Sequence, residues 1–214
     1  MRLDLRVYVI TDPGAGDHED LARAALAGGA TVVQLRDKRA TSRRLYEVAV
    51  RLQHLVAEAG VPLIVNDRVD VALAAGAAGV HLGPDDLPVG SARRILGSSG
   101  IVGASAGTVA EAVEAERAGA DYIGAGPVFA TATKPDAGVP IGLEGLRRIA
   151  AAVRVPVVGI GGITAENAGS VIAAGASGVA VISAVVATED KVGAARAIRQ
   201  AVDATLAQRG AEVR

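Results

Sequence analysis

The chain has 214 residues, carries 22 Lys and Arg against 23 Asp and Glu for a formal net charge of −1, and contains no cysteine. This balance, without any long run of like charge, argues against nucleic-acid binding, and the lack of cysteine excludes disulfides, thiolate nucleophiles and cysteine metal sites. Half of the residues are hydrophobic, but no stretch of about 20 apolar residues is long enough to span a bilayer, so the chain is expected to be soluble.

The N-terminal residues MRLDLRVYVITD run directly into a strand pattern. Because no basic segment, long apolar segment and cleavage site precede that pattern, we expect a cytoplasmic protein. The length suits one large domain, and we expect residues 1–214 to form a single catalytic domain. The sequence leaves the oligomeric state open, a homo-oligomer included.

Eight short apolar runs follow one another along the chain. Most are apolar continuously rather than at alternate positions, which is typical of strands in a parallel sheet that is covered on both faces. The predicted strands are Val7 to Ile10, Thr31 to Leu35, Leu63 to Val65, Val80 to Leu82, Ile101 to Ala104, Tyr122 to Ala125, Val155 to Ile160 and Val179 to Ile182.

The segments between these runs have helical periodicity. From Thr41 to Gly60 the apolar residues recur every three or four positions, with Thr41 or Ser42 available as N-cap and Gly60 as the stop. Further helices are predicted over Thr108 to Gly119, Leu143 to Val153, Thr164 to Gly175 and Lys191 to Gly210, with a short one near Ser91 to Leu96.

A small Ala-Gly-Ala turn recurs where a helix ends and a new strand begins, for example at Ala75-Gly76-Ala77 and Ala174-Gly175-Ala176. Glycine accepts the left-handed conformation past a helix end, and small residues let the next strand start close beneath the helix. Eight strands alternating with helices predict an α/β protein with a single-domain (β/α)₈ TIM barrel; a doubly wound open sheet is the main competitor.

In such a barrel, reactive residues follow the strands. Asp67 and Asp86 each come after a predicted strand, so the two carboxylates are expected on one rim, where Mg²⁺ takes one or two protein carboxylates plus substrate phosphate oxygens. The alternative is that both residues simply form loops and cap helices.

Strand two ends in Gln34, Arg36 and Lys38, which alternation turns in a common direction, so anionic substrate groups are implied. An ordinary charged loop produces the same pattern. The fifth strand ends at Ser105 among residues small enough to leave room for a ligand, although this segment also fits a plain turn.

The longest non-helical segment, 126–142, is rich in Pro, Gly and Thr, and loops of this length are usually functional or mobile. Its Thr131, Thr133 and Lys134 suit a phosphorylated ligand. The runs Gly159 to Thr164 and Val181 to Ala184 follow strands seven and eight, where barrel enzymes bind phosphate through backbone N–H groups. Paired glycines also occur where tight packing demands them.

The three histidines, His18, His54 and His81, are interpreted as structural. His18 is expected in a polar loop before the first helix, His54 in a helix and His81 inside a strand. With no cysteine and no histidine at a strand exit, a histidine-based nucleophilic triad has no support.

Taken together, these segments resemble the thiamine phosphate synthase family over nearly the whole chain, and their combination is more specific than any single motif. The resemblance rests on YVITD (Tyr8 to Asp12), QLRDK (Gln34 to Lys38), NDRVDVAL (Asn66 to Leu73), GVHLGPDDLP (Gly79 to Pro88), GASA (Gly103 to Ala106), GPVFATATKPDAG (Gly126 to Gly138), GIGGIT (Gly159 to Thr164) and GVAVISA (Gly178 to Ala184).

The resemblance implies a barrel enzyme that joins hydroxymethylpyrimidine diphosphate to thiazole phosphate and releases pyrophosphate. It implies Mg²⁺ on Asp67 and Asp86, and Arg36, Lys38, Lys134 and Ser105 as the catalytic residues. The pyrimidine diphosphate would contact Gln34, Arg36, Lys38, Asn66, Ser105 and Lys134, and the thiazole phosphate Thr131, Thr133, Gly162, Ile182 and Ser183.

Gly107 departs from the family pattern, because thiazole tautomerases and many synthases carry a histidine there. Pro84 replaces a common Gln with little expected effect.

Two other classes of function remain open. One is a tautomerase-like isomerase of a thiazole or sugar phosphate, and the other is a non-catalytic phosphate-ligand sensor. Asp67, Asp86 and Lys134 favour the synthase, since neither alternative needs a diphosphate and metal site.

Overall fold

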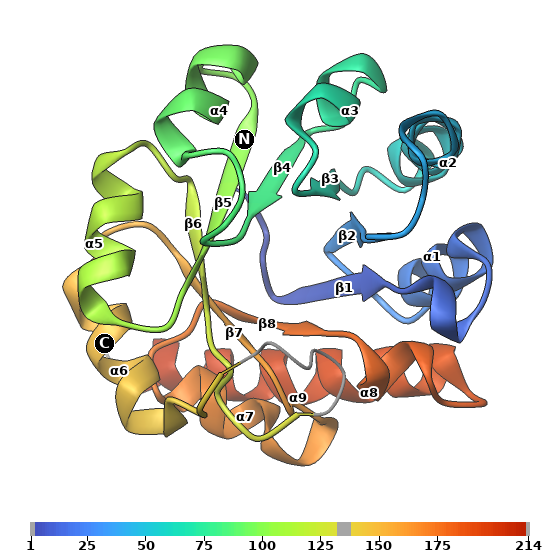
Figure 1. Ribbon diagram of the computed structural model, residues 1–214. Helices are drawn as coiled ribbons and strands as arrows, with labels where there is room; N and C mark the ends of the chain where they lie inside the picture. Colours follow the sequence, from blue (N-terminus) through green and yellow to red (C-terminus); the bar gives the residue numbers. More distant parts are fainter. Residues whose placement is uncertain (1–2, 132–137, 213–214) are drawn as a thin grey trace.

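Eight parallel strands close into a barrel in the computed structural model, which describes residues 3–131 and 138–212 (Figure 1). The strands are β1 (Val7–Thr11), β2 (Val32–Leu35), β3 (Leu63–Asn66), β4 (Gly79–Leu82), β5 (Ile101–Ala106), β6 (Tyr122–Ala125), β7 (Val157–Ile160) and β8 (Gly178–Val181). Each pairs with its neighbours in chain order, and β8 pairs with β1. The predicted TIM barrel is therefore confirmed, and the open doubly wound sheet is excluded.

Helices surround this ring of strands (Figure 1). They are α1 (His18–Ala27), α2 (Ser42–Glu58), α3 (Val69–Ala74), α4 (Val89–Leu96), α5 (Val109–Arg117), α6 (Gly142–Ala152), α7 (Ala165–Ala173), α8 (Ser183–Val186) and α9 (Lys191–Glu212), with a 3-10 turn, η1 (Pro13–Ala15), before α1. The expected helices are all present, within a few residues of the bounds predicted from periodicity.

Local sequence signals account for several helix ends. The Thr41 hydroxyl accepts from the Arg44 backbone N–H at the start of α2, and Thr108 forms a capping box with Glu111 at the start of α5. Gly76 and Gly175 both have positive φ, at +65° and +111°. These glycines thus take the left-handed conformation that the Ala-Gly-Ala turns predict.

The expectation that His18 lies in a loop is wrong, because His18 is the first residue of α1. The Asp17 carboxylate accepts hydrogen bonds from the backbone N–H groups of Glu19 and Asp20, so it caps the helix one residue before His18. The His18 side chain is buried, with 7% of its surface exposed.

Alternation along β1 separates the core into an inner and an outer layer. Tyr8 and Ile10 pack in a cluster with residues from other strands, and Val7 and Val9 belong to a second cluster that includes helical residues. Side chains therefore fill the barrel interior, while the other face of each strand packs against helices. Within the described ranges, 3–131 and 138–212, no helix is long and apolar enough to cross a membrane.

Candidate active site

The carboxylates of Asp67 and Asp86 come together at the mouth of the barrel, where both residues line a pocket of about 190 Å³. Asp67 directly follows β3, and Asp86 lies in the loop after β4, where its carboxylate accepts from the Gly83 backbone N–H at 2.7 Å. Burial, followed by the neighbouring Asp86 carboxylate, raises the pKa of Asp67 to about 6. The predicted acidic rim is therefore present in the fold.

The backbone holds Asp67 in an uncommon conformation. Its φ is +63°, the left-handed region that Asp and Asn adopt more readily than other side chains. Its backbone N–H donates to the carbonyl oxygen of His81 on β4 at 2.9 Å. The chain thus turns sharply at the end of β3 and directs the carboxylate into the mouth rather than out to solvent.

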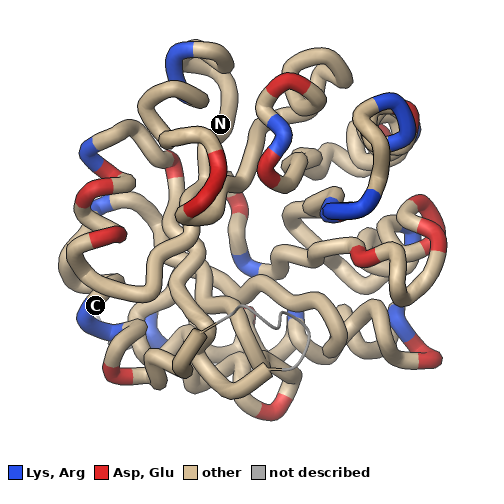
Figure 2. Tube along the Cα trace, in the orientation of Figure 1, with Lys and Arg blue, Asp and Glu red and all other residues tan. Residues whose placement is uncertain are grey.

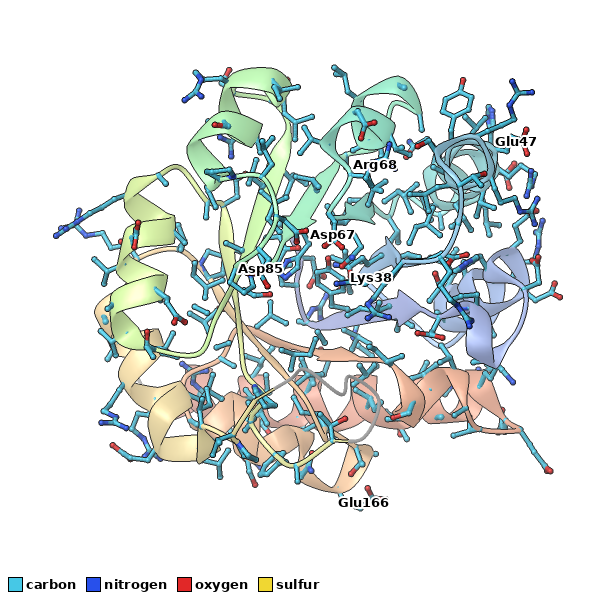
Figure 3. The ribbon with its side chains drawn as sticks, in the orientation of Figure 1. Lys38, Glu47, Asp67, Arg68, Asp85 and Glu166 are labelled. Atoms are coloured by element: carbon cyan, nitrogen blue, oxygen red, sulfur yellow. The ribbon has the colours of Figure 1, made fainter. Side chains whose placement is uncertain are left out.

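Two cations face this rim from the segment after β2. The Lys38 Nζ lies 3.6 Å from the Asp67 carboxylate, and Figure 3 shows the two side chains next to each other. Arg36 lies 3.1 Å from the Asp12 carboxylate, so Asp12 holds the guanidinium beside the mouth. Both side chains line the smaller pocket. In the view of Figure 2, Lys, Arg, Asp and Glu residues are otherwise interspersed over the outer helices.

The same pocket gathers the other side chains that were expected to contact the pyrimidine diphosphate. Gln34 lies on β2 with only 2% of its surface exposed, and Ser105 lies on β5. With them the pocket is lined by Arg36, Lys38, Asn66, Asp67 and Asp86. Lys134 lies outside the described residues.

A second cavity, of about 1120 Å³, adjoins this pocket and shares Asp86, Ser105 and Ile182 with it. It contains the residues expected to hold the thiazole phosphate: Thr131, Gly162, Ile182 and Ser183. Thr133 lies outside the described residues. Because the two cavities share walls, two ligands bound in them would lie next to each other.

Glycine is required at Gly161 and Gly162 for two separate reasons. Both have positive φ, +97° and +63°, and a Cβ added at Gly162 would lie 2.6 Å from the carbonyl oxygen of Ala130. This fits the packing alternative that the sequence left open. Because no Cβ fits at these two positions, no side chain covers this part of the cavity wall. Its backbone groups are therefore exposed to a ligand.

Three polar side chains of the site were not anticipated from the sequence: Tyr8, His81 and Tyr122. All three line the smaller pocket and form hydrogen bonds inside the barrel. His81 had been interpreted as structural because it lies within a strand. The available signal was its alternation with the apolar residues Val80 and Leu82, which turns the imidazole toward the barrel interior.

Comparison with known proteins agrees with this geometry. A family model described as thiamine monophosphate synthase matches residues 7–185. A thiamine-phosphate synthase of Chloroflexus aurantiacus is 54% identical over 206 residues, which cover 95% of both chains. The chain belongs to the thiamine monophosphate synthase family.

Another family member, the thiamine-phosphate synthase of Methanoculleus marisnigri, is 55% identical over 205 residues, covering 94% of this chain and 97% of that protein. The structure of the thiamine phosphate pyrophosphorylase from Pyrococcus furiosus is 48% identical, with a TM-score of 0.90 over 95% of this chain and 98% of that one. A 3-hexulose-6-phosphate synthase is only 19% identical, with a TM-score of 0.72, and shares the fold alone.

The donor set of the rim suits a hard divalent cation. Among residues 3–131 and 138–212 no group of three or more His, Cys, Asp or Glu side chains could hold a metal, so a cation here would rely on Asp67 and Asp86. Mg²⁺ binds in this way, with substrate phosphates and water completing its oxygen ligands. The two carboxylates repel each other, and this repulsion contributes to the raised pKa of Asp67. A cation bound between them would reduce the repulsion.

Proposed function

We propose that this protein is a thiamine phosphate synthase, a transferase of thiamine biosynthesis. It condenses 4-amino-2-methyl-5-(diphosphooxymethyl)pyrimidine with thiazole phosphate to give thiamine phosphate and pyrophosphate. The observation that carries the proposal is the pair of adjoining cavities, one with carboxylates and cations and one with glycines and hydroxyls. High identity to curated synthases over nearly the whole chain supports it.

In the proposed reaction the bond between the pyrimidine methylene carbon and the diphosphate oxygen breaks, and its electron pair leaves with pyrophosphate. The thiazole nitrogen then donates its lone pair to the methylene carbon of the electron-rich pyrimidine cation. No protein nucleophile is needed. The contribution of the chain is to align two substrates and stabilise developing negative charge, and alignment alone supplies about 7–11 kcal/mol.

Each group of residues has a separate task. Asp67 and Asp86 would hold Mg²⁺, which when bound neutralises charge on the leaving pyrophosphate. Arg36, Lys38 and Lys134 bind diphosphate oxygens, and Gln34, Asn66 and Ser105 orient the pyrimidine. Thr131, Thr133, Gly162, Ile182 and Ser183 hold the thiazole phosphate. In this proposal residues 1–214 act as one catalytic domain on small molecules in the cytoplasm, without nucleic acid or membrane partners.

The direct test mixes purified protein with both substrates, with and without Mg²⁺, and follows pyrophosphate together with the coupled product. The expected result is equal amounts of both, formed only with Mg²⁺. Turnover of a thiazole phosphate alone without Mg²⁺ would indicate an isomerase. Binding without any product would indicate a ligand sensor, and either result would contradict the proposal.

The metal role is tested with Asp67→Asn and Asp86→Asn. We expect kcat/KM to fall about 100- to 1000-fold in each, because leaving-group charge is no longer neutralised. Asparagine tolerates the left-handed backbone of Asp67, so the melting temperature without Mg²⁺ should not fall. Asp70→Asn, an exposed carboxylate paired with Arg68, is the matched control. Full Mg²⁺-dependent activity in both variants would exclude the rim as the metal site.

A further inference from the structure

A continuous chain of hydrogen bonds crosses the interior of the barrel between two residues of the proposed pyrimidine site. Gln34 Nε2 donates to the Tyr8 hydroxyl at 2.7 Å, and the Tyr8 and Tyr122 hydroxyls lie 2.8 Å apart. The Tyr122 hydroxyl lies 3.0 Å from His81 Nδ1, and His81 Nε2 lies 3.0 Å from Ser105 Oγ. Five strands thus contribute one polar side chain each.

Two glycines make room for the rings of this chain. A Cβ at Gly103 would lie 2.1 Å from the Tyr122 ring, and a Cβ at Gly124 would lie 2.9 Å from His81 Cε1. The His81 and Tyr122 rings stack, with centroids 5.5 Å apart and planes at 27°. The absence of a Cβ at these two glycines leaves space that both rings fill, so the backbone of the barrel fixes where the two rings lie.

The two tyrosines remain neutral in this environment. Tyr8 and Tyr122 have only 2% and 1% of their surface exposed, and burial raises the pKa of both hydroxyls well above the usual value. Each therefore keeps a single hydrogen to donate. A buried hydroxyl hydrogen without an acceptor costs about 1–3 kcal/mol, so every donor in the chain should be paired.

Counting hydrogens leaves two arrangements for neutral His81. In the first, Gln34 donates to Tyr8, Tyr8 to Tyr122, Tyr122 to His81 Nδ1, and His81 Nε2–H to Ser105. Gln34 then offers its carbonyl oxygen to the pocket, and Ser105 offers its hydroxyl hydrogen. In the second arrangement every bond is reversed, so both ends change together.

We propose that Tyr8, Tyr122 and His81 are positioning residues that couple Gln34 to Ser105, so that the pocket always presents one acceptor and one donor. An aminopyrimidine carries the complementary groups, an amino donor and ring-nitrogen acceptors. The inference rests on the proposed function for the identity of the ligand. It adds a specificity role for three residues that do not themselves carry the chemistry. With Gln34 Nε2 as the donor to Tyr8, the chain of hydrogen bonds has the first arrangement.

The coupling is tested by the tautomer of His81, which ¹⁵N NMR reports without any turnover. The chain has three histidines, so His18→Gln and His54→Gln assign the signals. We expect the Nε2–H tautomer in the parent protein. In Q34E at alkaline pH the introduced carboxylate can only accept, so the chain should reverse and His81 should become the Nδ1–H tautomer.

Adding Tyr122→Phe to Q34E removes the central hydroxyl and should abolish this change of tautomer. The same His81 tautomer in the parent protein and in ionised Q34E would overturn the coupling, as would a reversal that persists without the Tyr122 hydroxyl. Neither result depends on synthase activity, so failure of this inference is separate from failure of the proposed function.

Kinetics gives the second readout. Tyr122→Phe alone should lower kcat/KM for the pyrimidine diphosphate roughly tenfold, since Ser105 loses its set orientation, and should leave KM for thiazole phosphate unchanged. Tyr46→Phe, which alters an exposed tyrosine of α2, is the matched control. Equal effects of Tyr122→Phe on both substrates would indicate a structural role only and overturn the specificity role.

Discussion

At the scale of single residues, His18 shows how burial changes the chemistry of a side chain. Its Nδ1 lies 2.7 Å from the Thr11 hydroxyl, which donates to the Gln34 carbonyl oxygen at 3.2 Å. Nδ1 is thus hydrogen-bonded to a side chain at the end of β1. The other ring nitrogen, Nε2, has no hydrogen-bond partner among the described residues and faces the Asp37 carboxylate at 3.9 Å.

Burial lowers the pKa of His18, against the opposing charges of Asp37, Asp17 and Asp12. The unfolded chain therefore binds a proton near pH 6.5, where the folded chain does not, and stability falls as the pH drops through this range. Between neutral and mildly acidic pH, we expect the unfolding free energy of His18→Gln to fall less steeply than that of the parent protein. The difference in slope corresponds to the uptake of at most one proton on unfolding. Urea denaturation at a series of pH values measures it.

The matched control is His54→Gln, because His54 is exposed on α2. It should keep the pH dependence of the parent protein. Comparing each variant with the parent removes the contributions of other groups, including Asp67, whose raised pKa acts in the opposite direction. Identical pH dependence in all three proteins would mean that His18 titrates alike in the folded and unfolded states.

At the scale of elements, two strands begin where only glycine fits. A Cβ at Gly79, the first residue of β4, would lie 1.9 Å from the Ile101 carbonyl oxygen. A Cβ at Gly178, the first residue of β8, would lie 1.8 Å from the Leu5 carbonyl oxygen. These atoms belong to the neighbouring backbone, which cannot move away without disturbing strand pairing.

We expect Gly79→Ala to destabilise the fold by about 3 kcal/mol or more, or to prevent accumulation of folded protein. Gly90→Ala in α4 is the control, since a Cβ at Gly90 would lie at an ordinary contact distance of 3.7 Å from the Ala118 carbonyl oxygen. Alanine there should stabilise by roughly 0.4–1 kcal/mol through its better helix propensity. Thermal and urea unfolding compare the two, and similar stability of both variants would refute the close-approach argument.

At the scale of the whole molecule, the smaller pocket with Asp67 and Asp86 and the larger cavity with Gly162 and Ser183 adjoin each other. Charge added to the larger cavity should therefore affect one substrate selectively. Ser183→Asp brings a carboxylate to the proposed thiazole phosphate site, and like-charge repulsion should raise KM for that substrate at least about tenfold. Thermal stabilisation by Mg²⁺ and pyrophosphate should remain.

Ser170→Asp adds the same charge on an exposed part of α7, away from both cavities, and should leave both KM values unchanged. Steady-state kinetics with each substrate varied in turn measures the effect. If Ser183→Asp left KM for thiazole phosphate unaltered, or weakened pyrophosphate binding instead, the assignment of the two cavities would be wrong.

The sequence by itself determined the eight strands and the helices between them, because continuous apolar runs, helical periodicity and Ala-Gly-Ala turns are local patterns that each specify their own element. It predicted the barrel, and the pairing of β8 with β1 then excluded the doubly wound alternative. It also identified the strand ends that supply Asp67, Asp86, Arg36 and Lys38, since parallel strands bring their ends to one rim. Family resemblance added the expected roles, which for each residue stay predictions.

Only the tertiary structure decided how the interior polar side chains are connected. His81 was interpreted as structural and His18 as part of a loop, because neither residue has a local pattern that reveals its partners. The bonds of His81 reach Tyr122 and Ser105 on β6 and β5, and those of His18 reach Thr11 on β1. A hydrogen-bond partner across a barrel depends on strand register and closure, and these exist only once the eight strands have met.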